Sequence, residues 1–342
     1  MHSLLLSAWR EIRWLLRVSR PRFWMYVFGP FLIGIAAAFR AYHDITPQER
    51  WRAMIGIVYN IFELFLSFLK NIGHDRSLII FLVLFIAFIV LLFGYFLFPA
   101  NLLLYGVNDY FDRDTDKLNP KKDAYEQRLT DVSAPRLLIW IVVINTIWLL
   151  ALIIFFFQLP FLTPFTIALS ISFLIGFIIL SMTYSAPPFR FKARPFFDSI
   201  SNILYIFPGL FAYFFFTPSL SFPLPWLAIA AGSFWCMAMH AYSAVPDIEA
   251  DTKAGLQTIA TKLGAYRTLL VCLVLYILSA IFAAAASSGF VLRYTFLVLG
   301  LVYVGMMIIS LTRLDKLMPI YKRFPLVNTV VGMSIFLALV LL

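Results

Sequence analysis

The chain has 342 residues, of which 62% are hydrophobic, 18% aromatic and only 13% charged, and its net charge is +10. Soluble domains are roughly half apolar and about a quarter charged, so this composition excludes an ordinary soluble protein. The two cysteines, Cys236 and Cys272, lie inside long apolar runs, which argues against a disulfide framework and against a thiolate metal site.

Residues 1–22 predict an amphipathic helix on a membrane surface, not a cleaved signal. Two sets of residues recur at helical spacing: a basic set, Arg10, Arg13, Arg17 and Arg20, and an apolar set, Leu5, Trp9, Ile12 and Leu16. Residues at such spacings share one face of a helix, so the arginines would face anionic lipid headgroups.

The rest of the chain, residues 23–342, predicts an all-α integral membrane domain. A membrane span needs roughly 20 apolar residues, and long runs of this chain carry no charge. Prolines divide the longest runs into pairs of spans. The nine expected spans are 23–39, 79–104, 137–157, 164–183, 199–216, 225–244, 268–287, 293–311 and 326–342.

The distribution of lysine and arginine predicts the orientation of the spans. With the N-terminus in the cytoplasm, 21 of the 27 basic residues fall in inner segments and 6 in outer ones. The same residues are dispersed over several loops, which disfavours nucleic-acid binding. The chain is therefore expected to be a multi-pass protein of the plasma membrane, with the loops 105–136, 184–198 and 245–267 forming a cytoplasmic cap.

One segment leaves the topology open. Residues 53–69 are mostly apolar but are interrupted by Asn60 and Glu63. If the segment crossed the membrane, the N-terminus would lie outside and the basic residues would divide 19 to 8. An interfacial or re-entrant helix on the outer side fits the charge distribution better.

An acidic cluster follows the second expected span. Carboxylates at the end of a membrane helix are costly and mark a functional site. If the span continues as a helix, Asn108, Asp109, Asp112 and Asp116 fall within about 100° of one another, whereas Asp114 points away. Four oxygen-bearing side chains on one face are typical of a site for a hard cation.

A second acidic cluster follows the sixth expected span. Asp247 and Asp251 share a helical face and Glu249 lies on the other side. Mg²⁺ prefers oxygen ligands and is commonly held by one or two carboxylates together with substrate phosphates. Two such patches could clamp a diphosphate and stabilise pyrophosphate as a leaving group. Solvated loop acids and a calcium or transport site remain alternatives.

Basic residues near these clusters could bind the phosphate oxygens. The candidates are Arg113, Arg128, Arg190 and Lys192. The last two belong to a Pro-containing turn after the fourth expected span, which begins at Tyr184. Arg190 could equally be an ordinary positive-inside anchor.

Three motifs together resemble the UbiA superfamily of intramembrane prenyltransferases. They are N-D-x-x-D-R-x-x-D at 108–116, T-Y-S-A-P-P-x-R-x-K at 183–192 and D-x-x-x-D at 247–251. The resemblance implies nine transmembrane helices around a central cavity, with Mg²⁺ and an isoprenyl diphosphate at the cytoplasmic cap. It also implies a lateral opening that admits a hydrophobic acceptor from the lipid.

The resemblance assigns roles to individual residues. Those implied as metal ligands are Asn108, Asp112, Asp116, Asp247 and Asp251, with Asp109 beside the first set as a catalytic candidate. Arg113 and Lys192 would hold the diphosphate, and Tyr184 would border the reacting carbon. Many members carry an Asn-x-Arg-Pro-Leu run after the first motif, where this chain has residues 125–129 as Y-E-Q-R-L. That departure weakens the role of Arg128.

The stretch 240–264 is similar to lycopene elongases within the superfamily. Those enzymes add dimethylallyl units to the ends of lycopene on the way to C50 carotenoids, sometimes with hydration. His240 precedes Asp247 by seven residues and is a candidate proton acceptor, or alternatively a hydrogen-bonded residue of the cavity wall. An allylic cation would form from the diphosphate, and a double bond of the acceptor would attack it.

Other functions remain open at this stage. The acceptor could be an aromatic quinone precursor, a chlorophyllide or haem, or a lipid alcohol. A cation transporter could use the same acids, but it should place ionisable groups near the middle of the membrane, where the charge-free runs of this chain leave almost none. The sequence does not indicate a protein partner.

Overall fold

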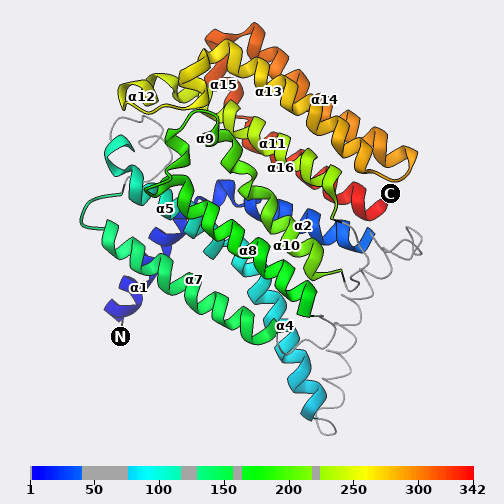
Figure 1. Cartoon of the computed structure of the whole chain (residues 1–342). Helices are drawn as coiled ribbons and strands as arrows, with labels where there is room; N and C mark the ends of the chain where they lie inside the picture. Colours follow the sequence, from blue (N-terminus) through cyan, green and yellow to red (C-terminus); the bar gives the residue numbers. More distant parts are fainter. Residues whose placement is uncertain (1, 41–75, 117–128, 157–163, 218–223) are drawn as a thin grey trace.

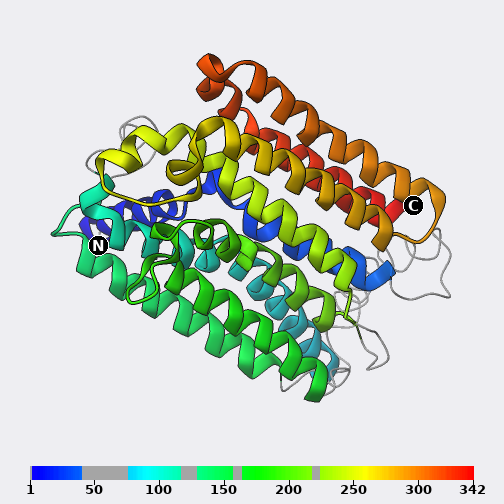
Figure 2. The same cartoon turned by 45° about the horizontal axis from the view of Figure 1, so that its top comes forward.

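The computed structural model describes residues 2–40, 76–116, 129–156, 164–217 and 224–342, and all regular elements in these ranges are helices. The long helices form one elongated bundle, with the two chain termini at opposite ends (Figures 1 and 2). The predicted interfacial segment 53–69 lies outside the described residues.

The chain begins with α1 (His2–Val18), followed by the short helix η1 (Pro21–Phe23) and by α2 (Met25–Arg40). Leu15 and Val18 of α1 are buried in a small apolar cluster with residues of α5 (Pro99–Asp116) and α7 (Ala134–Phe156). Arg20 links the first two helices with φ at 52°, a left-handed conformation that non-glycine residues rarely adopt. The turn therefore aims one particular arginine side chain back toward the bundle.

Seven of the described helical stretches are long and apolar enough to cross a membrane. They are Pro21–Arg40, Ile86–Arg113, Ala134–Phe155, Pro164–Ser185, Ile259–Ala286, Phe290–Thr312 and Phe324–Leu341. The two other predicted spans correspond to η3 (Ser201–Ile206) with α10 (Phe207–Phe215), and to α11 (Trp226–Ala244). The all-α membrane class is thus confirmed, whereas the number of nine spans is not.

The second predicted span is divided at Pro99. The helix α4 (Arg76–Leu97) ends just before this proline, which has no N–H to continue the helical hydrogen bonds, and α5 begins there. Asn101 donates from its side chain to the carbonyls of Phe96 and Leu97 at the break. The helix α5 then carries the first acidic cluster as far as Asp116, as the helical phase of the cluster assumed.

Close helix packing brings α2 to the centre of the bundle. A Cβ atom on Gly34 of α2 would lie 2.1 Å from the carbonyl oxygen of Gly209 in α10, so the two helices touch backbone to backbone. On its other side α2 packs against α16 (Phe324–Leu341). The helix α11 packs against α13 (Ile259–Ala286), which packs in turn against α14 (Phe290–Thr312).

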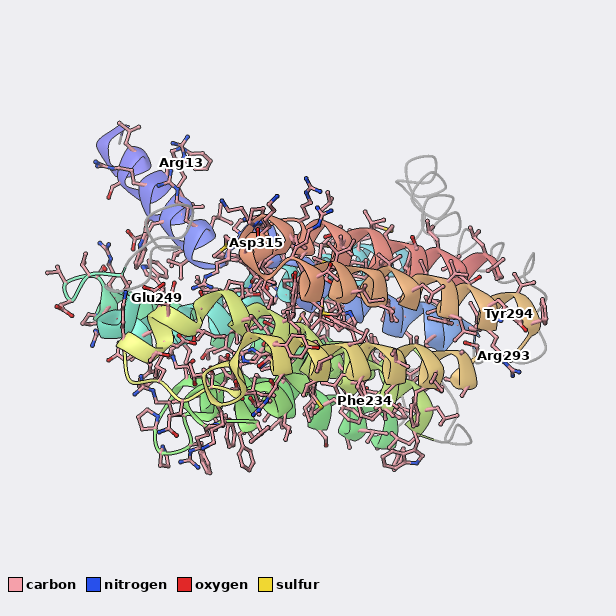
Figure 3. The ribbon with its side chains drawn as sticks, turned by 90° about the horizontal axis from the view of Figure 1, so that it is seen from above. Arg13, Phe234, Glu249, Arg293, Tyr294 and Asp315 are labelled. Carbon is pink, nitrogen blue, oxygen red and sulfur yellow. The ribbon has the colours of Figure 1, made fainter. Side chains whose placement is uncertain are left out.

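Short helices gather at one end of the bundle, which we call the cap end. After α8 (Pro164–Ser185), the chain forms η2 (Phe191–Ala193) and α9 (Phe197–Ile200) there. The other short elements are η4 (Val245–Asp247), α12 (Ile248–Lys253), η5 (Leu314–Lys316) and α15 (Leu317–Tyr321). In Figure 3, Glu249 lies toward the cap end, and Arg293 and Tyr294 lie toward the other.

Candidate functional site

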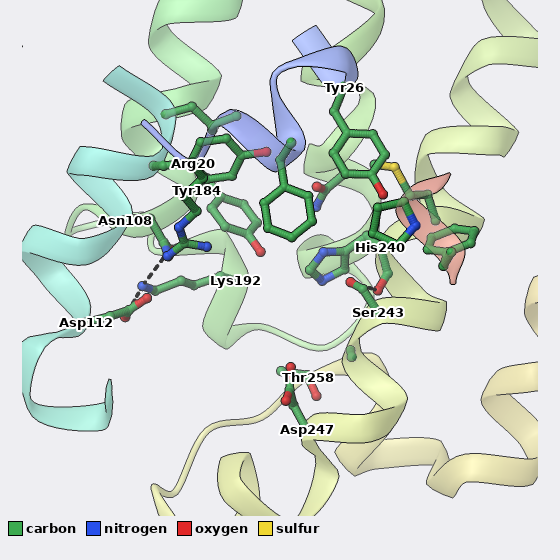
Figure 4. A pocket seen from close by; sticks show the side chains of 18 of the residues that line it. Arg20, Tyr26, Asn108, Asp112, Tyr184, Lys192, His240, Ser243, Asp247 and Thr258 are labelled. Carbon is green, nitrogen blue, oxygen red and sulfur yellow. Dashed lines mark hydrogen bonds and ion pairs between the residues drawn. The ribbon is translucent and has the colours of Figure 1, made fainter. Parts of the chain in front are cut away.

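A cavity of about 280 Å³ opens at the cap end. Its walls come from the C-terminal half of α5, the turn before α2, the end of α8, η2, α11 and the η4–α12 segment. Figure 4 shows Asn108, Asp112 and Lys192 on one side of it, Asp247 on another, and His240 between them. With Tyr321 and Pro325 from the end of the chain, the cavity brings together residues from five distant parts of the sequence.

The first wall carries Asn108 and Asp112, one helical turn apart on α5. The ammonium group of Lys192 contacts the Oδ1 atoms of both, at 3.3 Å from that of Asn108. Ser185 donates a hydrogen bond of 2.8 Å to the same Asn108 oxygen. Arg190, with φ at 41°, turns the chain so that η2 points Lys192 into the cavity. Oxygen atoms of α5 therefore converge on a cation.

A buried ion pair stands beside this wall and was missed in the sequence. Arg20 Nη2 lies 2.6 Å from Asp109 Oδ1, and the guanidinium group packs over the ring of Tyr105 at 5.0 Å. Arg20 lines the cavity, whereas Asp109 does not. The sequence pattern grouped Arg20 with the basic face of the first helix, although its place directly before Pro21 at the start of a span could have marked it.

The second wall carries Asp247 and Asp251, also one helical turn apart, and both line the cavity. Glu249 is exposed and lies 2.6 Å from Lys253, whose hydrogen bond and charge lower the pKa of Glu249. This orientation agrees with the helical phase of the cluster. Pro246 does interrupt the helix between His240 and Asp247, yet both side chains face the same cavity.

His240 and Tyr184 form the third part of the site. Their rings meet edge to face, with centroids 6.0 Å apart and an interplanar angle of 85°. The Nε2 atom of His240 lies 3.5 Å from Oδ2 of Asp198, a fully buried residue of α9. Asp198 was not among the sequence candidates, because a single carboxylate after a run of aromatic residues carries no recognisable pattern.

The remaining candidates lie elsewhere or outside the described residues. Arg113 does not line the cavity: it packs over the Tyr110 ring, with its Nε 3.7 Å from Asp131 Oδ1. Arg190 is not a lining residue either, although its Nη2 lies 4.0 Å from Asp112 Oδ1. Arg128 and the side chain of Asp116 belong to the part of the chain that the structure does not describe.

The oxygen-rich walls fit Mg²⁺. Within the described residues, no three or more His, Cys, Asp or Glu side chains form one metal-binding group. Each wall instead offers two oxygen-bearing side chains, and Lys192 shows that those of Asn108 and Asp112 can share one cation. Mg²⁺ usually keeps several waters and takes the rest of its ligands from substrate phosphates, so a site completed by a diphosphate needs no more from the protein.

A second and larger cavity, which we call the apolar chamber, adjoins the first. It has a volume of about 550 Å³ and lies among α2, α10, α11, α13, α14 and α16. Arg22, Phe23, Tyr26 and Pro325 line both cavities. From there the chamber follows α2 to Arg40 at the other end of the bundle, so an apolar space lies next to the polar cavity and extends along the span.

Comparisons with known sequences agree with the motif analysis. A model of the UbiA prenyltransferase family matches residues 73–319. The chain is similar to the lycopene elongase/hydratase of Haloferax volcanii, with 36% identity over 323 residues, 94% of this chain and 86% of the relative. It is also similar to the lycopene elongase/hydratase of Halobacterium salinarum, with 37% identity and 94% of each chain covered.

A solved structure of a UbiA homolog from Archaeoglobus fulgidus bound to GPP and Mg²⁺ has a similar fold. It matches with a TM-score of 0.56 at 18% identity, over 95% of this chain and 99% of that chain. The same homolog bound to DMAPP and Mg²⁺ matches with a TM-score of 0.55, also at 18% identity, over 96% of this chain and 99% of that chain. At this identity the match establishes the fold.

Proposed function

This chain belongs to the UbiA prenyltransferase family, and we propose that it transfers the dimethylallyl group of dimethylallyl diphosphate to an end of lycopene. The observation that carries the proposal is that two cavities of different character lie side by side. A polar cavity with acids on two walls suits a diphosphate, and it shares four lining residues with an apolar chamber that suits the end of a polyene. The names of the two archaeal relatives support this acceptor.

The diphosphate would lie at the cap end between the acidic walls. Asn108 and Asp112, with Asp116, and Asp247 with Asp251 would hold Mg²⁺, which lowers the charge of pyrophosphate as it leaves. Arg20 and Lys192 line the cavity and would donate charge-assisted hydrogen bonds to phosphate oxygens. Asp109 would act by holding the Arg20 guanidinium in place, not by touching the substrate.

Breaking the allylic C–O bond leaves a carbocation that needs a dry aromatic surrounding. Phe23, Tyr26, Tyr105 and Tyr184 line the cavity. Aromatic faces attract cations, and the exclusion of water protects the allylic cation from hydrolysis. A terminal double bond of the acceptor would then attack it. His240 would accept the proton that the resulting adduct releases.

The apolar chamber has dimensions that suit one end of the acceptor. It follows the 16 residues of α2, which at 1.5 Å per residue span about 24 Å. An extended polyene of 40 carbons is longer than this, so one part of it would lie along the chamber with its end at Tyr26, beside the diphosphate, and the rest would extend beyond the chamber. The positive-inside distribution favours a plasma membrane protein whose cap end faces the cytoplasm, where soluble diphosphates are made.

The test offers the purified protein a choice of acceptors in lipid nanodiscs. Dimethylallyl diphosphate and Mg²⁺ are supplied with lycopene, with 4-hydroxybenzoate or with a lipid alcohol, and prenylated products are identified by mass spectrometry. We expect product from lycopene, loss of product on chelation of Mg²⁺, and at least a 100-fold lower rate for Asp112→Ala. Product from 4-hydroxybenzoate alone would overturn the carotenoid assignment.

A further inference from the structure

A buried carboxylate stands behind His240. Asp198 has no exposed surface, and its Oδ2 accepts a hydrogen bond of 2.8 Å from the backbone N–H of Ile259. The same oxygen lies 3.5 Å from His240 Nε2, whereas Oδ1 has no hydrogen-bond partner among the described residues. The oxygen that accepts this backbone N–H is thus also within ion-pair distance of an imidazole that lines the cavity, and the Nε2 atom of that imidazole makes no hydrogen bond within the described residues.

Burial makes this carboxylate costly unless a cation compensates it. An ionised carboxylate loses its hydration when it is buried and needs hydrogen bonds or an opposite charge. Within the described part of the chain, His240 is the one basic side chain within ion-pair distance of Asp198. Asp198 therefore lies where its side chain can fix the orientation of the His240 ring.

The local backbone does not need the carboxylate. Asn202 and Ser201 donate to the main-chain carbonyl of Asp198, at 2.6 and 3.3 Å, and the Asp198 N–H donates to the Arg194 carbonyl. These bonds hold the α9 turn whatever the side chain of residue 198. The carboxylate adds one hydrogen bond to Ile259, which the side-chain oxygen of an asparagine could also accept.

The geometry assigns a proton-accepting pair to the cavity: Asp198 positions His240, and His240 receives the proton released after C–C bond formation. This inference rests on the proposed prenyl transfer. The Asp198 carboxylate, 3.5 Å from Nε2, favours the tautomer with its hydrogen on that nitrogen, which leaves the lone pair on Nδ1 to accept a proton, as in Asp-His pairs of hydrolases.

The proton balance is the same for either product. In elimination, the C–H bond next to the cationic carbon of the adduct breaks, its electron pair forms the new double bond, and the proton passes to Nδ1. In hydration, a water oxygen bonds to that carbon and one of its O–H bonds loses the proton to Nδ1. Each turnover thus delivers one proton to His240, which must later release it to solvent.

The experiment compares Asp198→Asn, His240→Gln and the double variant with the wild-type protein. Ser201→Ala is the matched control, because Ser201 contacts the same segment but not the carboxylate. Dimethylallyl diphosphate, Mg²⁺ and lycopene are supplied, and prenylated product and released pyrophosphate are measured separately, together with the donor KM and the unfolding temperature.

We expect Asp198→Asn to lower kcat for product roughly 100-fold while the donor KM stays within about twofold of the wild type. The amount of pyrophosphate released per molecule of prenylated product should rise. The donor still ionises in this variant, but the cationic adduct loses its proton slowly. His240→Gln should behave alike, and the double variant should be no slower than His240→Gln alone, since the two residues act as one unit.

Two results would overturn the assignment. One is wild-type kcat in Asp198→Asn. The other is that both single variants lose unfolding temperature and kcat together while the ratio of pyrophosphate to product stays unchanged. That result would indicate a structural role for the two residues. A wild-type protein that prenylates none of the acceptors would instead refute the proposed function, so the two failures are distinguishable.

Discussion

Three acidic side chains at the cap end form ion pairs with basic side chains. Asp109 pairs with Arg20, Asp112 with Lys192 and Glu249 with Lys253. The first two pairs are largely buried, so their charges interact through a medium of low polarity, whereas the third is exposed and weakly coupled. A count of carboxylates would treat these acids as equal, but only those that face the cavity can act on a diphosphate.

Asp247→Asn tests this distinction at the second wall, with Glu249→Gln as its control. Both changes remove one negative charge from the same short segment, but only Asp247 lines the cavity. We expect Asp247→Asn to lower kcat at least tenfold and to raise the Mg²⁺ concentration needed for half-maximal rate, because a metal ligand loses its charge. Glu249→Gln should stay within about twofold of the wild type. Equal effects of the two changes would contradict a metal site on that wall.

Some features of the site were predictable from local sequence and others were not. Helical phase is local, so the directions of Asp247, Asp251 and Glu249 could be inferred from their spacing. Arg20 and Asp198 act through long-range contacts, across 89 residues to Asp109 and across 42 to His240. No periodicity encodes such contacts, and the left-handed turn at Arg20 is one that sequence patterns rarely predict.

Among the helices, α2 has the most constrained position. It contacts α10 through Gly34 and Gly209, and the Gly209 Cβ position lies only 2.8 Å from the Pro30 carbonyl oxygen. Small residues allow this approach, which is the usual way in which membrane helices gain packing energy. Because Tyr26 of α2 lines both cavities, a displacement of α2 would move a wall that the two cavities share.

Gly34→Ala should separate α2 from α10. Its methyl group would overlap the Gly209 carbonyl, and neither backbone can yield without moving its helix. We expect a loss of about 1–3 kcal/mol in the free energy of unfolding, seen as a lower unfolding temperature in detergent. Gly305→Ala in α14 is the control, because its Cβ would meet nothing within 4 Å. An unchanged unfolding temperature in Gly34→Ala would show that the two helices are not in backbone contact.

The helices themselves were predicted with uneven success. Seven expected spans reappear as long apolar helices, because unbroken hydrophobic length is a strong signal. The fifth expected span instead combines η3 with the nine-residue helix α10. Hydrophobicity does not distinguish such composite elements from a continuous helix, since buried 3₁₀ and α segments have the same composition.

At the scale of the whole molecule, polarity changes along the bundle axis. The cap end holds the acidic walls and the buried ion pairs, and the apolar chamber extends from it toward the other end, where Arg40 donates to the Ser288 carbonyl. The family predicted from three short motifs is confirmed by the sequence comparisons, and the membrane class predicted from the long apolar runs is confirmed by the apolar helices and the fold. The place where the two cavities meet at Tyr26 was not predictable, since it depends on how several helices pack.

A bulky residue in the apolar chamber should discriminate between acceptors by length. Gly332 of α16 lines the chamber, and its Cβ would meet nothing within 4 Å, so Gly332→Phe can place a ring there without a backbone clash. The ring should displace two or three carbons of the acceptor from the chamber, at a cost of about 0.8 kcal/mol each. We therefore expect kcat/KM for lycopene to fall roughly 30-fold. A short polyene of the same end group should be used at the wild-type rate.

Val302→Phe is the control for this change, because Val302 is an exposed residue of α14 outside the chamber lining. It should leave both acceptors unaffected. If Gly332→Phe slows the short and the long acceptor equally, the ring disturbs the donor site or the fold. If it slows neither, the polyene does not lie in the chamber, and the acceptor must reach Tyr26 directly from the lipid.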